Sequence, residues 1–322
     1  MYIVTGGAGF IGSALVWKLN QQGIDNILVV DDLGSNDKWK NLVNRSYADY
    51  LHKTTFLQLL QKENLADVTA VLHMGACSST TELDAEYLME NNYRYSKILA
   101  EFCLRRHIRF IYASSAATYG DGDQGFDDEP TRMPRLKPLN MYGYSKQLFD
   151  LWALRNNLLQ GMVGLKFFNV FGPNEYHKND MMSVVCKAFS QIKTSGRLRL
   201  FKSCRMDFAH GEQKRDFIYV KDCVDVIWWL LEHPEVNGLF NLGRGKAQSW
   251  NELAQAVFSA MDLPFAVEYI DMPENIRPKY QYFTQAVMDR LKSRGCPVQS
   301  ADLAESVADY VRNYLMQEDP YL

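Results

Sequence analysis

Cysteine motifs and metal-ligand spacings are missing from this sequence. Its six cysteines include no C-x-x-C pair, and none stands at zinc-ligand spacing from a histidine. We therefore expect no metal site and reduced thiols, which are typical of a reducing compartment. The cysteines are Cys77, Cys103, Cys186, Cys204, Cys223 and Cys296.

The chain also lacks a basic block and a long apolar run. Its formal net charge is −3, so nucleic acid is not an expected partner. The longest strongly apolar run, residues 226–231, is far too short to cross a bilayer, and no basic leader precedes the first predicted strand. We expect a cytoplasmic protein without a membrane partner.

What the sequence does contain, from its second residue, is a strand, a glycine-rich turn and a helix. The apolar residues 2–5 precede Gly6, Gly9 and Gly12, and an apolar-periodic helix then runs to about residue 22. Gly6 permits a tight turn, Gly9 lets the backbone approach a pyrophosphate, and Gly12 lets the helix pack on the strand. The free N–H groups of the helix N-terminus suit phosphates. This order predicts a dinucleotide site.

The residues alone leave the choice between NAD and NADP open. A second apolar strand ends at Asp31, where an acid binds a ribose hydroxyl and so favours NAD. Lys38, Lys40 and Lys53 follow, however, and any one of them is able to pair with a 2′-phosphate.

A third predicted inner strand, residues 70–74, ends beside Gly75 and Ala76. These small residues let a cofactor pass close to the backbone. His73 near the end of this strand has two interpretations, a ligand or a hydrogen-bonded core residue. We favour the core residue.

The pattern Tyr-x-x-x-Lys occurs twice, as Tyr142…Lys146 and as Tyr93…Lys97. Residues four apart share one helical face, so each pair directs a phenol and an ammonium to one place. The ammonium favours the phenolate, so we expect a lowered tyrosine pKa and a base for a sugar hydroxyl. Only Tyr142 follows a strand that delivers Ser115 at its carboxyl end, where ligands bind in parallel sheets. Ser115, Tyr142 and Lys146 are therefore the predicted catalytic set.

The alternation of strands and helices predicts an α/β fold, namely a Rossmann-type doubly wound parallel sheet with a smaller, discontinuous C-terminal substrate domain. At 322 residues the chain is long for a single core, so two domains are expected. We expect residues 1–172 plus about 213–243 to bind the cofactor. Residues of about 173–212 plus 244–322 form the expected substrate domain.

Four segments resemble the extended short-chain dehydrogenase/reductase family, and in particular its sugar-nucleotide epimerases. They are residues 5–12, residues 114–120, Tyr142…Lys146 and residues 215–217. More specific strings occur at residues 75–81, 91–93, 138–146, 177–178, 280–281 and 283–286. Together they cover essentially the whole chain.

The resemblance implies tightly held NADP, an ADP-heptose substrate and a homo-oligomer, a pentamer in this family. Its implied reaction inverts C6″ in lipopolysaccharide core precursor synthesis, with Lys178 as a second base beside Tyr142. With the glycine motif, it places cofactor contacts at Gly6, Gly9, Phe10, Ile11, Gly12, Asp31, Asp32, Lys38, Lys53, Met74, Gly75, Ala76, Cys77, Ser78, Asn91, Lys146, Val170 and Lys178. It places substrate contacts at Ser115, Asn169, Asp180, Lys187, Phe201, Lys202, Ser203, Cys204, Arg215 and Tyr280.

Three residues depart from the family pattern. Met74 replaces a polar residue beside the cofactor, Asp180 places an acid near a pyrophosphate, and Lys187 replaces a histidine but keeps a cation. Lys178 itself has two interpretations, a base or a phosphate ligand.

Three other functions are alternatives to inversion at C6″. A dehydratase of this family carries an Asp-Glu pair where this chain has Ala116 and Ala117, which argues against that activity. A UDP-hexose 4-epimerase uses the same tyrosine and serine and stays open. The third alternative is a non-catalytic dinucleotide-binding regulator, which the intact Ser115, Tyr142 and Lys146 disfavour.

Overall fold

The computed structural model describes the whole chain except residues 63–64, 66, 275–276, 278–279 and 298–301. The strands of its central sheet are β1 (Tyr2–Thr5), β2 (Ile27–Asp31), β3 (Asp49–His52), β4 (Ala70–His73), β5 (Arg109–Ser115), β6 (Val163–Phe167) and β10 (Gly238–Leu242). Every pairing in this sheet is parallel, in the order β10-β6-β5-β4-β1-β2-β3. The predicted α/β fold with a doubly wound parallel sheet is confirmed.

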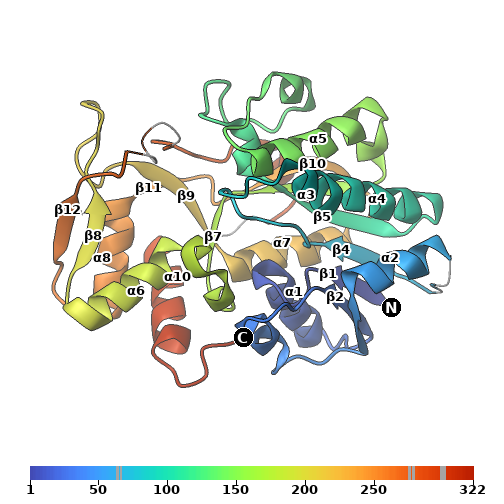
Figure 1. The fold of residues 1–322 in the computed structure, drawn as a ribbon, viewed down its shortest axis with the longest axis horizontal. Coiled ribbons are helices and arrows are strands. Elements are labelled where there is room, and N and C mark those ends of the chain that lie inside the picture. Colours follow the sequence, from blue (N-terminus) through green and yellow to red (C-terminus); the bar gives the residue numbers. More distant parts are fainter. Residues whose placement is uncertain (63–64, 66, 275–276, 278–279, 298–301) are drawn as a thin grey trace.

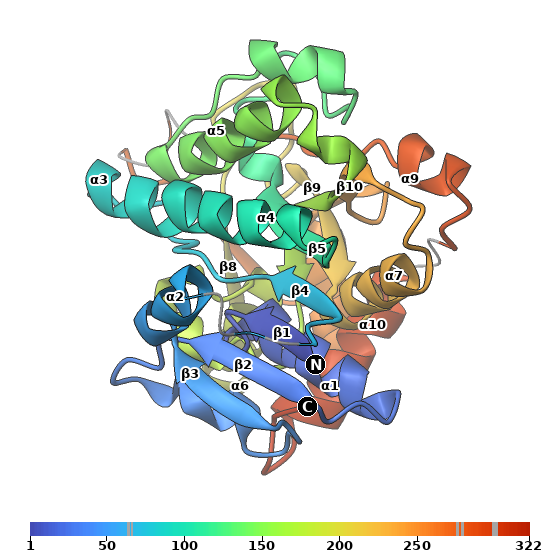
Figure 2. The same ribbon diagram turned by 90° about the vertical axis from the view of Figure 1, so that its right-hand side faces the viewer.

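Helices cover both faces of this sheet, as the end-on view in Figure 2 shows. One face carries α2 (Lys53–Gln61), α3 (Ala85–Leu88), α4 (Tyr95–Arg105) and α5 (Met141–Arg155), and the other carries α1 (Phe10–Gln21) and α7 (Val220–Glu232).

The two faces are built by alternation of apolar side chains along each strand. In β1, Ile3 packs into the core beneath α2, α4 and α5, whereas its neighbour Val4 packs into the core with α1 and α7. Val71 and Leu72 of β4 divide in the same way. Successive side chains of a strand point to opposite faces, so a strand between two helical layers is apolar throughout.

The remaining elements lie beside the carboxyl ends of the central strands (Figure 1). A three-stranded sheet joins β7 (Asn169–Phe171), β9 (Lys214–Tyr219) and β11 (Ala247–Ser249), and a two-stranded one joins β8 (Leu198–Phe201) to β12 (Val267–Ile270). The helices here are α6 (Val184–Ser195), α8 (Trp250–Ala260) and α10 (Leu303–Tyr310), whereas α9 (Asp289–Ser293) packs beside the edge strand β10. Short helical turns that bear on the site are η1 (Asp37–Leu42), η3 (Ala116–Tyr119) and η6 (Tyr176–Met181).

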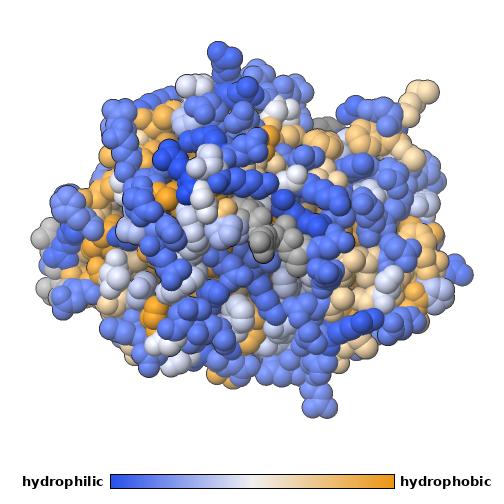
Figure 3. All heavy atoms as spheres, turned by 180° about the vertical axis from the view of Figure 1, so that it is seen from behind, coloured by the Kyte–Doolittle hydropathy of each residue, from blue (hydrophilic) through white to orange (hydrophobic). Residues whose placement is uncertain are grey.

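The surface seen from behind is mainly hydrophilic, with hydrophobic side chains in small scattered groups (Figure 3). Among the described residues, no helix is both long enough and apolar enough to span a membrane. All six cysteines are free thiols, and the described residues contain no cluster of metal-ligating side chains.

Candidate active site

The glycine-rich turn between β1 and α1 is a tight backbone loop. Gly6 has a φ of +66°, and its carbonyl accepts a hydrogen bond from the N–H of Gly9 at 2.9 Å. A Cβ atom on Gly6 would lie 2.6 Å from the backbone of Gly75, and one on Gly12 would collide with the carbonyl oxygen of Gly6. These glycines therefore keep a strip of backbone free of side chains, where a ligand is able to approach closely.

The N-terminus of α1 opens onto this strip. Its N-cap, Gly9, has no side chain to cap the helix, and the first turn contains no acidic residue. The first N–H groups of the helix and its positive dipole end are therefore available to an anion. The loop and the helix end together fit the diphosphate of a dinucleotide.

Asp31, at the end of β2, is engaged on both carboxylate oxygens. Its Oδ2 accepts from the N–H of Ala8 at 2.8 Å, and its Oδ1 accepts from Lys38 Nζ at 2.8 Å. Nearby, Lys53 Nζ lies 3.5 Å from Asp32 and donates to Asn91 Oδ1 at 3.0 Å. Two lysines thus surround the position where the second ribose of a dinucleotide is expected.

His73 is a core residue, as predicted from its strand. It is buried, its Nδ1 lies 2.6 Å from Thr5 Oγ1, and its Nε2 lies 2.8 Å from Ser96 Oγ. Burial lowers the pKa of His73 to about 3, and the charge of Lys146 adds to this effect.

Ser115 and Tyr142 come together where β5 and α5 meet. Ser115 ends β5, and its Oγ accepts from the N–H of Ala117 at 3.1 Å. Helix α5 begins with Asn140 as its N-cap, which accepts from the N–H of Gly143 at 2.8 Å. Tyr142 is therefore held in the first turn, directly beside the strand end.

The expected lowering of the Tyr142 pKa is wrong for this structure. Burial raises the pKa of Tyr142, and the hydroxyl of Ser115 offsets part of this rise. Burial also lowers the pKa of Lys146 to about 8, although the charge of Asp150 opposes it. The spacing of Tyr142 and Lys146 indicates that an ammonium lies near the phenol, but it does not show that both groups are removed from water. That removal is the larger effect on both pKa values here.

The alternative pair, Tyr93 and Lys97, faces a different place. Lys97 Nζ lies 5.4 Å from the ring centre of Tyr93 and 5.1 Å from that of Trp152 on α5. The ammonium thus packs on two aromatic rings, which is a structural contact.

Lys178 reaches the same site from η6, far along the chain. Its Nζ lies 4.8 Å from the ring centre of Phe10, the first residue of α1. Burial lowers the pKa of Lys178, and the buried carboxylate of Glu175 partly opposes this. The residue after it, Asn179, has φ 48° and ψ −119°, so the backbone bends sharply at this point.

These side chains surround two adjoining cavities of about 350 and 340 Å³. The first extends over the glycine strip, and the second extends toward α6 and α8. Ser115, Tyr142 and Lys178 line both. Volumes of this size are typical of small-molecule sites.

All the predicted cofactor residues line the first cavity or the smaller one that continues it toward Asp31 and Asn91. They include Met74, whose sulfur-bearing side chain stands at the wall where a polar residue was expected. The structure thus brings this predicted set together.

The predicted substrate residues are more dispersed. Ser115 and Asn169 line the second cavity, and Arg215 and Tyr280 line a wider groove beyond it. Ser203 and Cys204 line a separate surface hollow with residues 205–206 and 208–210. The predicted residues that line none of these cavities are Asp180, Lys187, Phe201 and Lys202.

Three of these outlying residues have polar partners outside the cavities. Lys187 Nζ donates to the main-chain carbonyl of Asp180 at 2.6 Å, and Lys202 pairs with Asp271 at 3.1 Å. Arg215 is buried between Trp250 and Tyr280, at 5.7 and 5.2 Å from their ring centres.

Comparison with known proteins identifies the family. Residues 2–243 match the NAD dependent epimerase/dehydratase family. The chain belongs to this family. The matched segment contains the glycine strip and the Ser115, Tyr142 and Lys146 set, so the resemblance seen in the sequence is confirmed.

Relatives in this epimerase/dehydratase family align along the full chain. An ADP-L-glycero-D-manno-heptose-6-epimerase of Nitratidesulfovibrio vulgaris (strain DP4) is 63% identical over 323 residues, covering 100% of both chains. One of Fusobacterium nucleatum is 48% identical, also covering 100% of both. The crystal structure of the Helicobacter pylori enzyme of that name has a TM-score of 0.82 and 27% identity, and the match covers 97% of this chain and 95% of that chain.

Sequence reasoning missed three polar residues of this epimerase/dehydratase site. Asn41 Nδ2 donates to the carbonyls of Ala8 and Asn174 at 2.9 and 3.0 Å, which ties the glycine loop to the segment before Lys178. Asp150 and Lys166 form a buried ion pair at 3.0 Å behind Ser115. The sequence does contain a sign of Asp150 and Lys166. Asp150 lies four residues after Lys146, on the same face of the predicted helix, and Lys166 is the one charged residue in an otherwise apolar strand.

Proposed function

We propose that this chain inverts C6″ of an ADP-heptose, converting ADP-D-glycero-β-D-manno-heptose to the L-glycero epimer in lipopolysaccharide core precursor synthesis. The observation that carries the proposal is the shared wall of Ser115, Tyr142 and Lys178 between a dinucleotide-type cavity and its neighbour. The identity of the sugar rests on the full-length relatives of that name.

A carbinol carbon has no acidic proton, so its inversion requires transient oxidation. A nicotinamide dinucleotide held over the strip of Gly6, Gly9 and Gly12 would supply reversible hydride transfer at that carbon, without net consumption of the cofactor. Tyr142 is the acceptor of the hydroxyl proton in one orientation of the sugar, and because burial raises the pKa of Tyr142, its phenolate needs the neighbouring Lys146 ammonium for this role. Ser115 donates a hydrogen bond to the same oxygen as charge develops there.

Lys178 is proposed to move the proton in the other orientation. A lysine serves as a base only where its pKa is lowered, and burial lowers the pKa of Lys178. The alternative is that Lys178 only holds phosphate. Lys178→Met separates the two, because loss of a base reduces kcat, whereas loss of uniform binding raises KM alone. A pure KM effect would leave Tyr142 acting without a second base.

We also propose NADP, rather than NAD, as the cofactor. Lys38 and Lys53 offer ammonium groups beside Asp31, whose carboxylate oxygens already accept from Ala8 and Lys38. An acid engaged in this way is less suited to binding a free ribose diol. Mass spectrometry of the molecule released by denaturation tests the assignment, and NAD alone would reject it.

The closing test of the function is incubation with purified ADP-D-glycero-β-D-manno-heptose and assignment of the C6″ configuration by NMR. Inversion supports the proposal. Retention at C6″, together with inversion at C4 of a UDP-hexose, would assign the chain to the 4-epimerases instead.

Two further expectations stand as proposals. We propose the division into a cofactor domain of residues 1–172 plus about 213–243 and a substrate domain of about 173–212 plus 244–322. We also propose a homo-oligomer, with five copies as the family resemblance implies. Light scattering of the purified protein gives the number of copies.

A further inference from the structure

Behind Ser115 lies a carboxylate with no access to solvent. Asp150, only 1% exposed, accepts hydrogen bonds from Tyr112 Oη at 3.0 Å and Ser114 Oγ at 2.6 Å. Its Oδ2 also pairs with Lys166 Nζ at 3.0 Å, and Lys166 is fully buried. A buried pair of this kind is costly to desolvate, so its presence beside a catalytic set calls for a physical reason.

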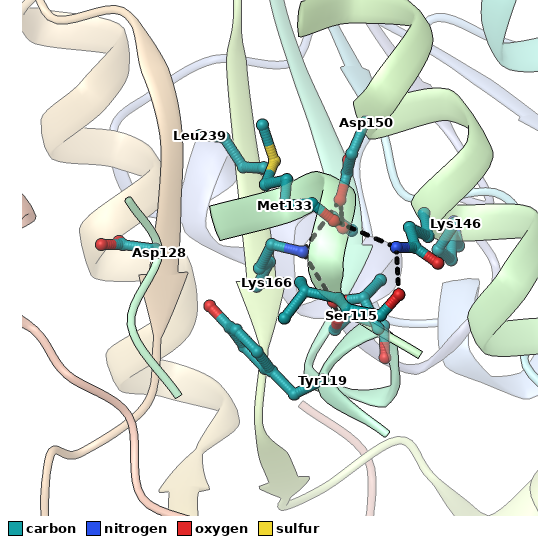
Figure 4. Close-up of polar contacts among 12 residues, drawn as sticks. Ser115, Tyr119, Asp128, Met133, Lys146, Asp150, Lys166 and Leu239 are labelled. Atoms are coloured by element: carbon teal, nitrogen blue, oxygen red, sulfur yellow. Dashed lines mark hydrogen bonds and ion pairs between the residues drawn. The ribbon is translucent and has the colours of Figure 1, made fainter. Parts of the chain in front are cut away.

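Asp150 lies between two lysines from different elements. Figure 4 shows Lys166 of β6 on one side of Asp150 and Lys146 of α5 on the other, with Ser115 below. Of these two lysines, Lys166 forms the ion pair with the carboxylate, whereas Lys146 Nζ donates to the carbonyl of Ala113, between the β5 residues Tyr112 and Ser114 that donate to Asp150. Tyr142, Lys146 and Asp150 are spaced four residues apart on α5 and therefore share one face of the helix. The carboxylate of Asp150 raises the pKa of Lys146 against the lowering that burial causes.

Lys166 is fixed by more than the ion pair. Its Nζ donates to Thr118 Oγ1 at 2.6 Å and lies 5.0 Å from the ring centre of Tyr119. The hydroxyl of Tyr119 in turn donates to Asn241 at 2.7 Å. The Lys166 ammonium is thus held in place on three sides and cannot move away to relieve its pairing with Asp150.

We propose that Asp150 is a positioning residue of the hydride-transfer site, a buried counter-ion that keeps Lys146 charged beside Tyr142, and that Lys166 stabilises the negative charge of Asp150. This inference rests on the proposed function. It explains why the carboxylate has a second cation: without Lys166, Asp150 would be left buried with only one ammonium nearby.

Lys146 and Asp150 are surrounded by polar and titratable groups from several elements. Lys146 Nζ donates to the carbonyl of Ala113 at 2.9 Å. The titratable and charged groups near Lys146 and Asp150 are His73, Cys77, Tyr112, Tyr119, Tyr142 and Lys166. The test below removes the charges of Asp150 and Lys166.

The test compares Asp150→Asn with the double variant Asp150→Asn/Lys166→Met, which removes both charges together and so avoids an unpaired buried lysine. Asp309→Asn is the matched control. Asp309, on α10, also accepts from a tyrosine and a lysine, Tyr219 Oη of β9 and Lys221 Nζ of α7, each at 2.7 Å, and none of the three lines the cavities described above.

Two measurements are made on the protein with its bound cofactor. The first is the pH profile of epimerisation, in which the alkaline limb should move to lower pH by about one unit in both Asp150 variants. The second is the tyrosinate absorbance of Tyr142, obtained by subtracting the matching Tyr142→Phe protein. Loss of the Asp150 carboxylate by itself lowers the pKa of Tyr142, so the same proteins are also compared in a Lys146→Met background. The shift of the tyrosinate titration to lower pH should be smaller, or reversed, where Lys146 is present, because there the phenolate also loses a neighbouring ammonium.

Unchanged profiles in both Asp150 variants, or an equal shift in Asp309→Asn, would overturn the proposal. A fall in activity at every pH, with the alkaline limb in place and an equal tyrosinate shift with and without Lys146, would show a purely structural role and also overturn it. If the wild-type protein does not epimerise ADP-heptose, the proposed function fails. The tyrosinate titration needs no substrate and still decides the role of Asp150.

Discussion

The hydrogen bonds of His73 fix its protonation state and predict how stability depends on pH. The hydroxyl of Ser96 donates to the carbonyl of Asn92, so its oxygen accepts from His73 Nε2. Nδ1 then carries no proton and accepts from Thr5. The folded protein therefore holds a neutral imidazole with its proton on Nε2.

The direction of this pH dependence follows from the difference between the pKa of His73 in the folded chain and in the unfolded chain. Burial lowers the pKa of His73 from 6.5 to about 3 in the folded chain, so between these values only the unfolded chain binds the proton. His73 thus contributes stability that is present above pH 6.5 and lost as pH falls toward about 3. The loss is about 1.4 kcal/mol per pH unit, or about 2 kcal/mol between pH 6.5 and 5.

Urea unfolding at neutral pH and at about pH 5 measures this loss, with His73→Gln as the comparison. Glutamine keeps a donor toward Ser96 but does not titrate, so the variant should lose about 2 kcal/mol less on acidification. His177, whose pKa burial lowers to about 4, contributes equally to both proteins. Equal losses in wild type and variant would refute a neutral, buried His73.

Three further outcomes are expected. Lys166→Met should lower the free energy of unfolding by about 3–5 kcal/mol in denaturant titrations, and adding Asp150→Asn should recover most of it, because the single change leaves a buried charge unpaired. Gly12→Ala should give protein that purifies without dinucleotide by mass spectrometry, since the new Cβ collides with Gly6; normal cofactor content would contradict this. Tyr142→Phe should reduce the rate by about 10²–10⁴-fold with cofactor retained, and near-full activity would mean that Tyr142 is not the base.

The sheet and its cofactor face could be predicted because their signals are local. The glycine spacing at Gly6 and Gly12, the apolar strands and the Tyr142…Lys146 pair each lie within a short segment, and the order of strands and helices arranges them. Ser115 was found in the same way, from the end of a single strand.

What escaped prediction depends on contacts between distant segments. Asn41 joins residues 8 and 174, and Lys166 meets Asp150 from another element. The pKa of Tyr142 was misjudged because burial is a property of the folded assembly, which the sequence spacing does not show. The placement of Asp180 and Lys187 outside the cavities likewise depends on how η6 and α6 lie beside the sheet.

The common wall of the two cavities has a thermodynamic consequence. Because Ser115, Tyr142 and Lys178 border both, a molecule that fills one cavity changes the surroundings of the other. Linkage then requires reciprocity: the factor by which the dinucleotide changes the affinity for the sugar nucleotide equals the factor by which the sugar nucleotide changes the affinity for the dinucleotide. A substrate that binds tightly only to the loaded protein therefore also raises, by the same factor, the equilibrium affinity with which the dinucleotide is held.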